Sequence, residues 1–410
     1  RDFCLSRGLG DVYKRQSPLE ADARCDVAVV GAGVTGALVA HALIDAGIDT
    51  IALDKRSAGG GSTAASTALL LYELDTPLRE LSAHFGQARA ARAYEMGVEA
   101  IRRLEGLTSD FARELGNDCG FERRPSLYLA SHSVTARGLR EECTLRQRHG
   151  IAVELLSDRD IASRYPFSAP AALLSRDAAQ VDPLRLTRSL LESATARGLR
   201  LYEHTEVTGY DTSATAARVS TATGHRVTAQ RIVFATGYEA LPYVGGPSFG
   251  GTLADIRTTY AFASEPVGTQ VLEKIGRWRD RCLIWETARP YLYVRTTPDG
   301  RVLVGGEDDD ATDRDVQLAR IPGKIAHLTA RFTQLFPDVK FEVHSAWAGI
   351  FESSHDGLPF IGSHPDYPRA CFALGYGGNG ITFAVMAADI LRDVLAGRGN
   401  PDAALFGFNR

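Results

Sequence analysis

The chain has 410 residues, of which 44% are hydrophobic and 23% charged, values typical of a globular protein with room for two domains. The net charge is −4 and the basic residues are scattered, which argues against nucleic acid as a partner. The six cysteines lie far apart without a CxxC spacing, so neither a metal site nor a disulfide framework is predicted, and a reducing cytoplasm is the expected compartment.

The first segment in chain order, residues 1–16, begins without Met and lacks the apolar stretch of a signal peptide. It resembles the translated read-through of a sequencing adapter. We therefore expect a non-native, disordered leader and leave it out of the fold prediction.

Residues 26–56 predict a nucleotide-binding unit. A run of strand-forming residues at 27–30 ends in the pattern Gly31-x-Gly33-x-x-Gly36, and a helix-like stretch follows. In such a turn Gly31 lets the chain reverse, Gly33 lets backbone N–H groups approach a pyrophosphate, and Gly36 lets the helix pack against the strand. The helix N-terminus then faces the phosphates with its partial positive charge.

A second strand at 50–53 completes this unit and ends at Asp54, an acid placed to accept hydrogen bonds from ribose hydroxyls. A membrane helix is the alternative interpretation of the same stretch. Three glycines and Thr35 interrupt the apolar run, however, and a span needs about 20 apolar residues. No transmembrane segment is predicted, and NAD or FAD is the expected ligand.

The loop after this unit, at 57–75, is rich in glycine and hydroxyl residues and leads into an apolar stretch that looks like the start of a helix. We expect it to contact the ligand rather than to serve as a plain connector. Period-two alternation with turn signals between 252 and 306 predicts an antiparallel sheet. The other predicted elements are helices at 77–115, 135–149, 184–197 and 325–335, strands at 126–131, 151–157, 199–211, 231–237 and 341–351, a hairpin at 218–230, and a strand, glycine loop and helix at 370–397.

Segments of the nucleotide-binding type thus occur three times, at 26–70, 199–240 and 340–397, with sheet-rich segments between them. An NAD domain usually forms one block of sequence. A discontinuous domain closed by a C-terminal glycine loop and helix favours FAD, a long molecule that several chain segments hold together.

Six motifs in this order resemble those of the FAD-dependent amine and D-amino-acid oxidase superfamily, over residues 24–397. They are VVGAGVTG followed by Asp54, GSTAASTALL, RIVFATGY, YLYVRTTPDGRVLVGGEDD, DGLPFIG and GYGGNGITF. The resemblance implies an α/β fold with two domains. A discontinuous Rossmann-like FAD-binding domain of the glutathione-reductase type would comprise 17–80, 151–240 and 340–410, and an α+β substrate domain built on an antiparallel sheet would comprise 81–150 and 241–339.

The resemblance also implies FAD as the cofactor and places its contacts. These are Gly31, Ala32, Gly33, Val34, Thr35 and Gly36 at the pyrophosphate, Asp54, Lys55 and Arg56 at the adenosine ribose, Ser62, Thr63, Ser66 and Thr67 along the ribitol, Val207 at the adenine, Ala235, Thr236 and Gly237 at the diphosphate, and Gly377, Gly378, Asn379, Gly380, Ile381 and Thr382 under the flavin. The last group has a physical reason too, because the N–H groups of a GGNG loop and the dipole of the following helix stabilise negative charge on a reduced flavin.

The family reaction oxidises a carbon–nitrogen bond of an amine or amino acid. Hydride passes to the flavin and water hydrolyses the imine, so neither a metal nor a side-chain nucleophile is expected. Oxygen is the first candidate for the electron acceptor. The alternatives are a dehydrogenase that reduces a quinone or carrier, and a non-catalytic flavoprotein subunit of a larger complex.

Two positions depart from the family pattern near the DGLPFIG motif. Glycine oxidase-like members carry an Arg five residues before Asp356, where this chain has Phe351, followed by Glu352. Sarcosine oxidase-like members attach the flavin to a Cys in this region, and this chain has none there, so non-covalent FAD is expected. The loss of this Arg at Phe351, together with the neighbouring acid Glu352, predicts a preference for cationic amines over glycine, sarcosine or D-alanine.

A rival carboxylate anchor comes from the strand YLYVRTT. Tyr293 and Arg295 share one face of it, so Arg295 could reach a substrate carboxylate, and a salt bridge at the rim is the alternative. Trp347 and Tyr260 are expected to be packing aromatics rather than catalytic residues.

Overall fold

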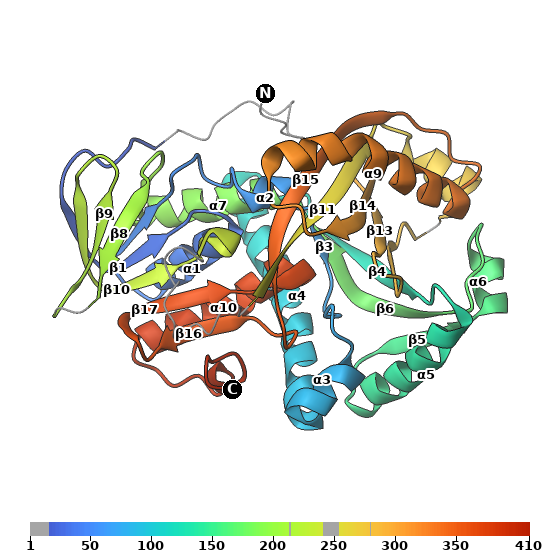
Figure 1. Cartoon of the computed structure of the whole chain (residues 1–410), viewed down its shortest axis with the longest axis horizontal. Helices are drawn as coiled ribbons and strands as arrows, with labels where there is room; N and C mark the ends of the chain where they lie inside the picture. Colours follow the sequence, from blue (N-terminus) through green and yellow to red (C-terminus); the bar gives the residue numbers. More distant parts are fainter. Residues whose placement is uncertain (1–15, 213–214, 241–253, 279) are drawn as a thin grey trace.

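The computed structural model describes residues 16–212, 215–240, 254–278 and 280–410, so all but the last residue of the expected leader lies outside the described ranges. Gln16 is described, and its backbone N–H donates to the Glu203 carboxylate at 2.8 Å. The chain forms two sheets and alternates between them, so that each sheet is assembled from several separate segments (Figure 1).

The first sheet has a parallel centre, in which β1 (Ala23–Val30) lies between β2 (Thr50–Leu53) and β10 (Arg226–Phe234). β7 (Arg200–Tyr202) extends it in parallel beyond β2, and β17 (Tyr367–Leu374) does so beyond β10. The edges are antiparallel: β16 (Phe360–His364) pairs with β17, β9 (Ala217–Thr221) with β10, and β8 (Val207–Asp211) with β9.

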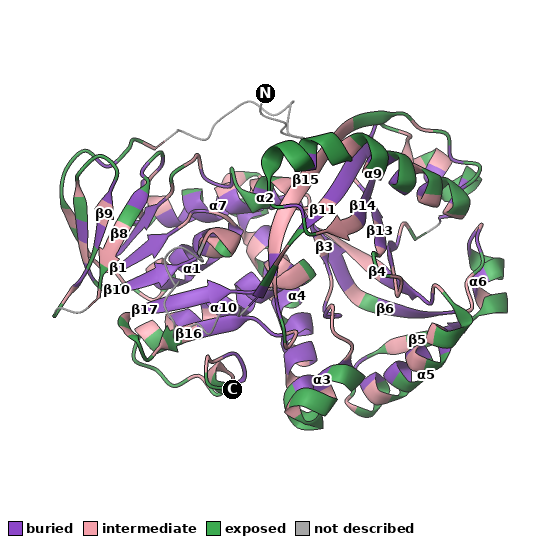
Figure 2. Ribbon diagram, viewed as in Figure 1, coloured by how far each residue is buried: buried purple, intermediate pink, exposed green. Residues whose placement is uncertain are grey.

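Both faces of this sheet are buried. On one face Val27 and Val29 pack against α1 (Val34–Asp45), α4 (Gln87–Leu115), α7 (Pro183–Ala196) and α10 (Gly380–Leu395). On the other face Ala28 and Val30 pack beneath the β8–β9 pair. Figure 2 shows the central strands β1, β10 and β17 as mostly buried, whereas β8 and β9 at the edge are partly exposed. The near-continuous apolar run of β1 follows from this two-sided burial.

The second sheet is larger and mostly antiparallel. Its strand order is β15 (Val343–Ser354), β11 (Ala254–Ser264), β14 (Val302–Asp309), β13 (Leu292–Thr296), β12 (Leu283–Glu286), β4 (Glu122–Leu129), β6 (Ala171–Gln180) and β3 (Leu69–Leu70), with β5 (Val153–Ser157) paired to β6. α9 (Arg314–Leu335) covers one face through Leu328 and Phe332. α5 (Ser133–Arg148) and α6 (Asp158–Arg164) complete this half, whereas α3 (Leu78–Phe85) packs Leu78 and Leu81 into the helical core of the first sheet.

Several predicted elements differ from the structure at glycine or proline residues and at turns. The helix expected at 77–115 is two helices, α3 and α4, because Gly86 at φ 80° breaks it. The strand expected at 199–211 is the pair β7 and β8, separated where Thr205 N–H donates to the Asp54 carbonyl at 2.7 Å. The helix expected at 325–335 begins at Arg314, and Pro322 inside it masks the helical pattern.

Two further alanine-rich segments differ from the prediction. The apolar helix expected to start within 57–75 is a four-residue helix, α2 (Ser62–Ala65), followed by the two-residue strand β3. Strand β6 is absent from the prediction, because most of its residues are buried on both faces and no period-two alternation marks it.

Sheet membership also differs from the predicted segment bounds. β5 and β6 fall in the segment 151–240 and β15 in the segment 340–410, yet all three strands belong to the second sheet. Helix α4 falls in the segment 81–150, yet it packs on the helical face of the first sheet. We propose domain bounds that follow the sheets, with crossings near Asp182 and Asp356.

No helix in the described part of the chain is long and apolar enough to cross a membrane. The described residues also contain no group of three or more His, Cys, Asp or Glu side chains placed to hold a metal ion.

Candidate active site

The glycine turn after β1 is closed by contacts that only glycine permits. Gly31 has φ +101°, and a Cβ built on it would lie 2.6 Å from the Ala235 carbonyl oxygen. A Cβ on Gly36 would lie 1.8 Å from the Gly31 carbonyl oxygen, so helix α1 rests directly on the turn. A Cβ on Gly33 would meet only the Thr63 hydroxyl, at 3.1 Å. Gly31 and Gly36 thus build the turn, whereas Gly33 leaves space beside it.

Asp54 holds the same turn from the end of β2. Its carboxylate accepts the Ala32 N–H and the Arg56 N–H, both at 2.7 Å. Burial raises the pKa of Asp54, and these two N–H donors oppose the rise. Thr63 adds a third contact, because its hydroxyl accepts the Val34 N–H at the start of α1 at 2.9 Å.

A cavity of about 820 Å³ extends from this turn and takes walls from both sheets. Of the residues predicted to bind the cofactor, all but three line it. Those that do are Gly31, Gly33, Val34, Thr35, Asp54, Lys55, Arg56, Ser62, Thr63, Ser66, Thr67, Val207, Ala235, Thr236, Gly237, Gly377, Gly378, Asn379, Gly380 and Ile381. The other three lie behind the wall: Ala32 bonds Asp54, Gly36 packs under the turn, and Thr382 donates to the Leu71 and Asn379 carbonyls.

The cavity fits a dinucleotide with phosphates. The space beside Gly33 borders the N-terminus of α1, where a helix favours anions. The Thr236 hydroxyl lines the cavity, is buried, and has no hydrogen-bond partner among the described residues, which is the state of a group that bonds a ligand. Lys55 and Arg56, predicted at the ribose, both form an ion pair with Glu239, at 3.1 and 2.8 Å.

The C-terminal glycine loop is tied to the segment 71–75. Asn379 is buried, and its side-chain amide donates to the Glu73 carbonyl at 2.8 Å and accepts the Asp75 N–H at 3.2 Å. The Asp75 carboxylate in turn accepts the Gly378 N–H at 2.7 Å. The loop therefore brings Asp75 into the cavity wall; the sequence predicted ligand contact for the segment 57–75 that ends at this residue, but did not single Asp75 out.

Replacing Asn379 with alanine is expected to lower the free energy of unfolding by about 2–4 kcal/mol, because each buried polar group left without a partner costs roughly 1–3 kcal/mol. It should also weaken FAD binding, since the glycine loop loses its anchor. Urea unfolding and FAD titration measure both effects. Asn400→Ala is the matched control, because Asn400 bonds Asp393 and Asp402 away from the cavity. Equal FAD affinity in both variants would contradict the anchoring role.

The far end of the cavity is lined by aromatic and polar side chains of the second sheet. Tyr291 and Tyr293 lie with ring centres 5.8 Å apart, and the Tyr293 hydroxyl is 3.1 Å from that of Thr259. Trp285 closes the wall, with its indole N–H bonded to Ser126 at 3.1 Å. Phe351 lines this cavity as well.

Asp308 lies next to these tyrosines, and sequence reasoning missed it. Its Oδ1 is buried without a hydrogen-bond partner among the described residues. Burial raises the pKa of Asp308 to about 6, with Asp75 adding to the rise and Thr259, Arg289 and Lys324 opposing it. Asp308 follows the GGE of the VLVGGEDD motif, but four acids, Glu307 to Asp310, stand in a row there and the sequence does not say which one is buried.

The structure gives Arg295 a different place from the predicted one. Arg295 is not among the residues that line the cavity. Its guanidinium donates to the Thr67 and Thr296 carbonyls beneath the loop at residues 66–68. Burial lowers its pKa to about 10. The shared strand face with Tyr293 is correct, but the loop 66–68 covers Arg295, so we do not retain it as a carboxylate anchor.

Glu352 lines the cavity, but its carboxylate is already engaged. It accepts the Gly375 N–H at 2.7 Å and is 6% exposed. Burial raises its pKa, and the Gly375 N–H opposes the rise. Trp347 and Tyr260 do not line the cavity; they bond the Ala65 carbonyl and the Asp309 carboxylate.

Comparisons with known proteins agree with this arrangement. A family model described as FAD dependent oxidoreductase (DAO) matches residues 26–394. A glycine oxidase of Bacillus licheniformis is 26% identical over 92% of this chain and 94% of its own length. A gamma-glutamylputrescine oxidoreductase of Escherichia coli is 27% identical over 94% of this chain and 87% of its own. The crystal structure of glycine oxidase from Geobacillus kaustophilus has the same fold, with a TM-score of 0.79, 22% identity and coverage of 95% and 99% of the two chains.

Proposed function

Because the chain belongs to the DAO family of FAD-dependent oxidoreductases, we propose that it oxidises a carbon–nitrogen bond of an amine or amino acid to an imine, which water then hydrolyses. One observation carries this proposal. A single cavity joins the cofactor cradle at Gly33 to a wall formed by Asp75, Tyr291 and Tyr293, so a small molecule at that wall lies against the cofactor.

When bound, FAD supplies the acceptor for the hydride and its two electrons. The chain supplies position and charge. Tyr291, Tyr293 and Trp285 offer flat apolar surfaces that hold a substrate and exclude water. The amine must lose a proton before its C–N bond is oxidised. Helix α10 points its N-terminus at the glycine loop, which favours negative charge on the cofactor.

We expect the FAD to be held without a covalent bond, since none of the described residues that line the cavity is a cysteine. Precipitation with acid or heat should then release a yellow supernatant that chromatographs as FAD. Colour that stays in the pellet would contradict this expectation, and a colourless protein that takes up no added FAD would contradict the cofactor itself.

The proposed reaction is tested by mixing the protein anaerobically with a panel of amines and amino acids. At least one of them should bleach the flavin absorbance and release the corresponding carbonyl compound. Admitting air then separates two classes of enzyme: an oxidase regains its colour and forms stoichiometric hydrogen peroxide, whereas a dehydrogenase regains it only with a quinone or dye. If no compound bleaches the flavin, the chain is not an amine-oxidising enzyme by itself.

A further inference from the structure

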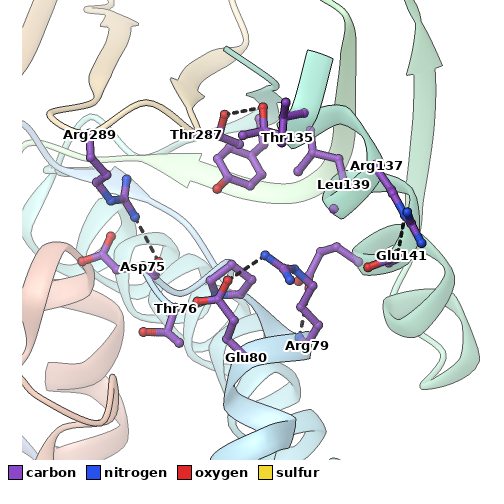
Figure 3. Close-up of a pocket in the computed structure, with 15 residues that line it drawn as sticks. Asp75, Thr76, Arg79, Glu80, Thr135, Arg137, Leu139, Glu141, Thr287 and Arg289 are labelled. Atoms are coloured by element: carbon purple, nitrogen blue, oxygen red, sulfur yellow. Dashed lines mark hydrogen bonds and ion pairs between the residues drawn. The ribbon is translucent and has the colours of Figure 1, made fainter. Parts of the chain in front are cut away.

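A second cavity of about 740 Å³ meets the first one at Asp75, which lines both. Figure 3 shows its walls: the start of α3 with Thr76 and Arg79 on one side, α5 with Thr135 on another, and Thr287 and Arg289 from the loop after β12 above them. The walls are polar and charged, so this cavity suits the polar part of a ligand.

Most charges in the second cavity neutralise one another. Arg79 pairs with Glu80 at 2.7 Å, and Arg137 pairs with Glu141 at 3.2 Å. Glu142 is satisfied by the backbone N–H groups at the start of α3 and by Arg146 at 2.8 Å. These groups leave little net charge for a ligand to meet.

Arg289 is the exception. Of the cations among the described residues that line either cavity, Arg289 alone has no carboxylate within ion-pair distance. Lys55 and Arg56 in the first cavity both form ion pairs with Glu239. Its guanidinium donates only to backbone carbonyls, at 3.3 Å to Asp75 and 3.5 Å to Ala288. Figure 3 shows it pointing across the cavity toward Asp75.

Arg289 lies against an aromatic ring of the first cavity. Its guanidinium lies 4.9 Å from the centre of Tyr291, which lines the substrate end. A guanidinium stacked on a ring keeps its N–H edge free for a planar anion. The two other positions considered for a carboxylate anchor are excluded, because residue 351 is a phenylalanine and Arg295 is bonded beneath the loop at residues 66–68.

On the basis of the proposed function, we infer that Arg289 binds a carboxylate of the substrate in the second cavity, while the amine lies at Asp75 and Tyr291 against the cofactor. The substrate class is therefore an amine that carries a carboxylate, rather than the purely cationic amine that the sequence suggested. Asp75 suits the ammonium group, because it carries a carboxylate and lines both cavities.

The inference is tested with matched pairs of compounds that differ only in the carboxylate: proline and pyrrolidine, sarcosine and dimethylamine, and 6-aminohexanoate and pentylamine. Wild-type protein should be reduced at least tenfold more efficiently by the acid of the best pair. Arg289→Gln should raise the dissociation constant of that acid at least tenfold and change that of its amine less than twofold, and Arg289→Lys should restore part of the loss. Arg137→Gln, in the same cavity but paired with Glu141, should behave as wild type. Equal effects of Arg289→Gln on acid and amine would overturn the inference.

A second measurement does not depend on turnover. Propionate and glutarate should perturb the flavin absorbance of wild type and Arg289→Lys at concentrations at least fivefold below those needed for Arg289→Gln. If no amine reduces the flavin but the protein still binds these acids through Arg289, the proposed function is refuted and the anion site is supported. Acid binding that Arg289→Gln leaves unchanged overturns the anion site and leaves the proposed function intact.

Discussion

Protein with valine at position 33 is expected to fold with nearly unchanged stability and to purify without FAD. Gly33 has φ −72°, which any residue adopts, and a Cβ there meets only the Thr63 hydroxyl at 3.1 Å. The two methyl groups of valine would instead occupy the space beside the turn that the phosphates need. The flavin-to-protein absorbance ratio, together with circular dichroism, measures the outcome.

Gly36→Val is the contrasting variant of the same motif. Its Cβ would lie 1.8 Å from the Gly31 carbonyl oxygen, so α1 would have to leave β1 and the helical core would open. We expect insoluble or unfolded protein from this variant and folded apoprotein from Gly33→Val. Full FAD occupancy in Gly33→Val would show that the motif is only a packing turn here.

Replacing Asp308 with asparagine should stabilise the protein at pH 8 by up to about 3 kcal/mol. Burial raises the pKa of Asp308 from 3.8 to about 6, and each unit is worth about 1.36 kcal/mol. Between these values the folded chain holds a proton that the unfolded chain has released. The free energy of unfolding of wild type therefore falls as the pH rises from about 4 to 6, and the deficit remains above pH 6.

Urea unfolding between pH 4 and 8 checks this prediction. The gain from Asp308→Asn should shrink toward pH 4, where the wild-type side chain is protonated in both states. A variant that is less stable than wild type at pH 8 would show that Asp308 is bonded in a way that favours its charge. A carboxylate kept at such a cost is typical of a functional site.

The cofactor half of the site could be predicted from the sequence because its signals are local. The turn at Gly31, Gly33 and Gly36 and the glycine loop at 377–380 each lie within a few residues, and backbone geometry alone dictates them. The family resemblance then placed the remaining contacts, most of which line the cavity.

The substrate half could not be predicted in the same way. Asp75, Asp308 and Arg289 come from three distant segments and meet only through the packing of the second sheet against the glycine loop. Strand parity correctly put Arg295 on the face of Tyr293 but could not show that the loop 66–68 lies above it. The sequence also could not single out Arg289 as the cation without an acidic partner, because Arg79 and Arg137 look no different in the sequence and only the structure shows their ion pairs.

The cavity has walls from both sheets, and this has a thermodynamic consequence. FAD that binds between the two halves and not to the unfolded chain stabilises their association by mass action, by about 2.7 kcal/mol at a concentration one hundred times its dissociation constant. Ser62 in the first half already bonds the Ile350 carbonyl in the second at 3.0 Å, so the cofactor and this contact reinforce one another. The free energy of unfolding therefore depends on the concentration of free FAD, and not only on the packing of either sheet.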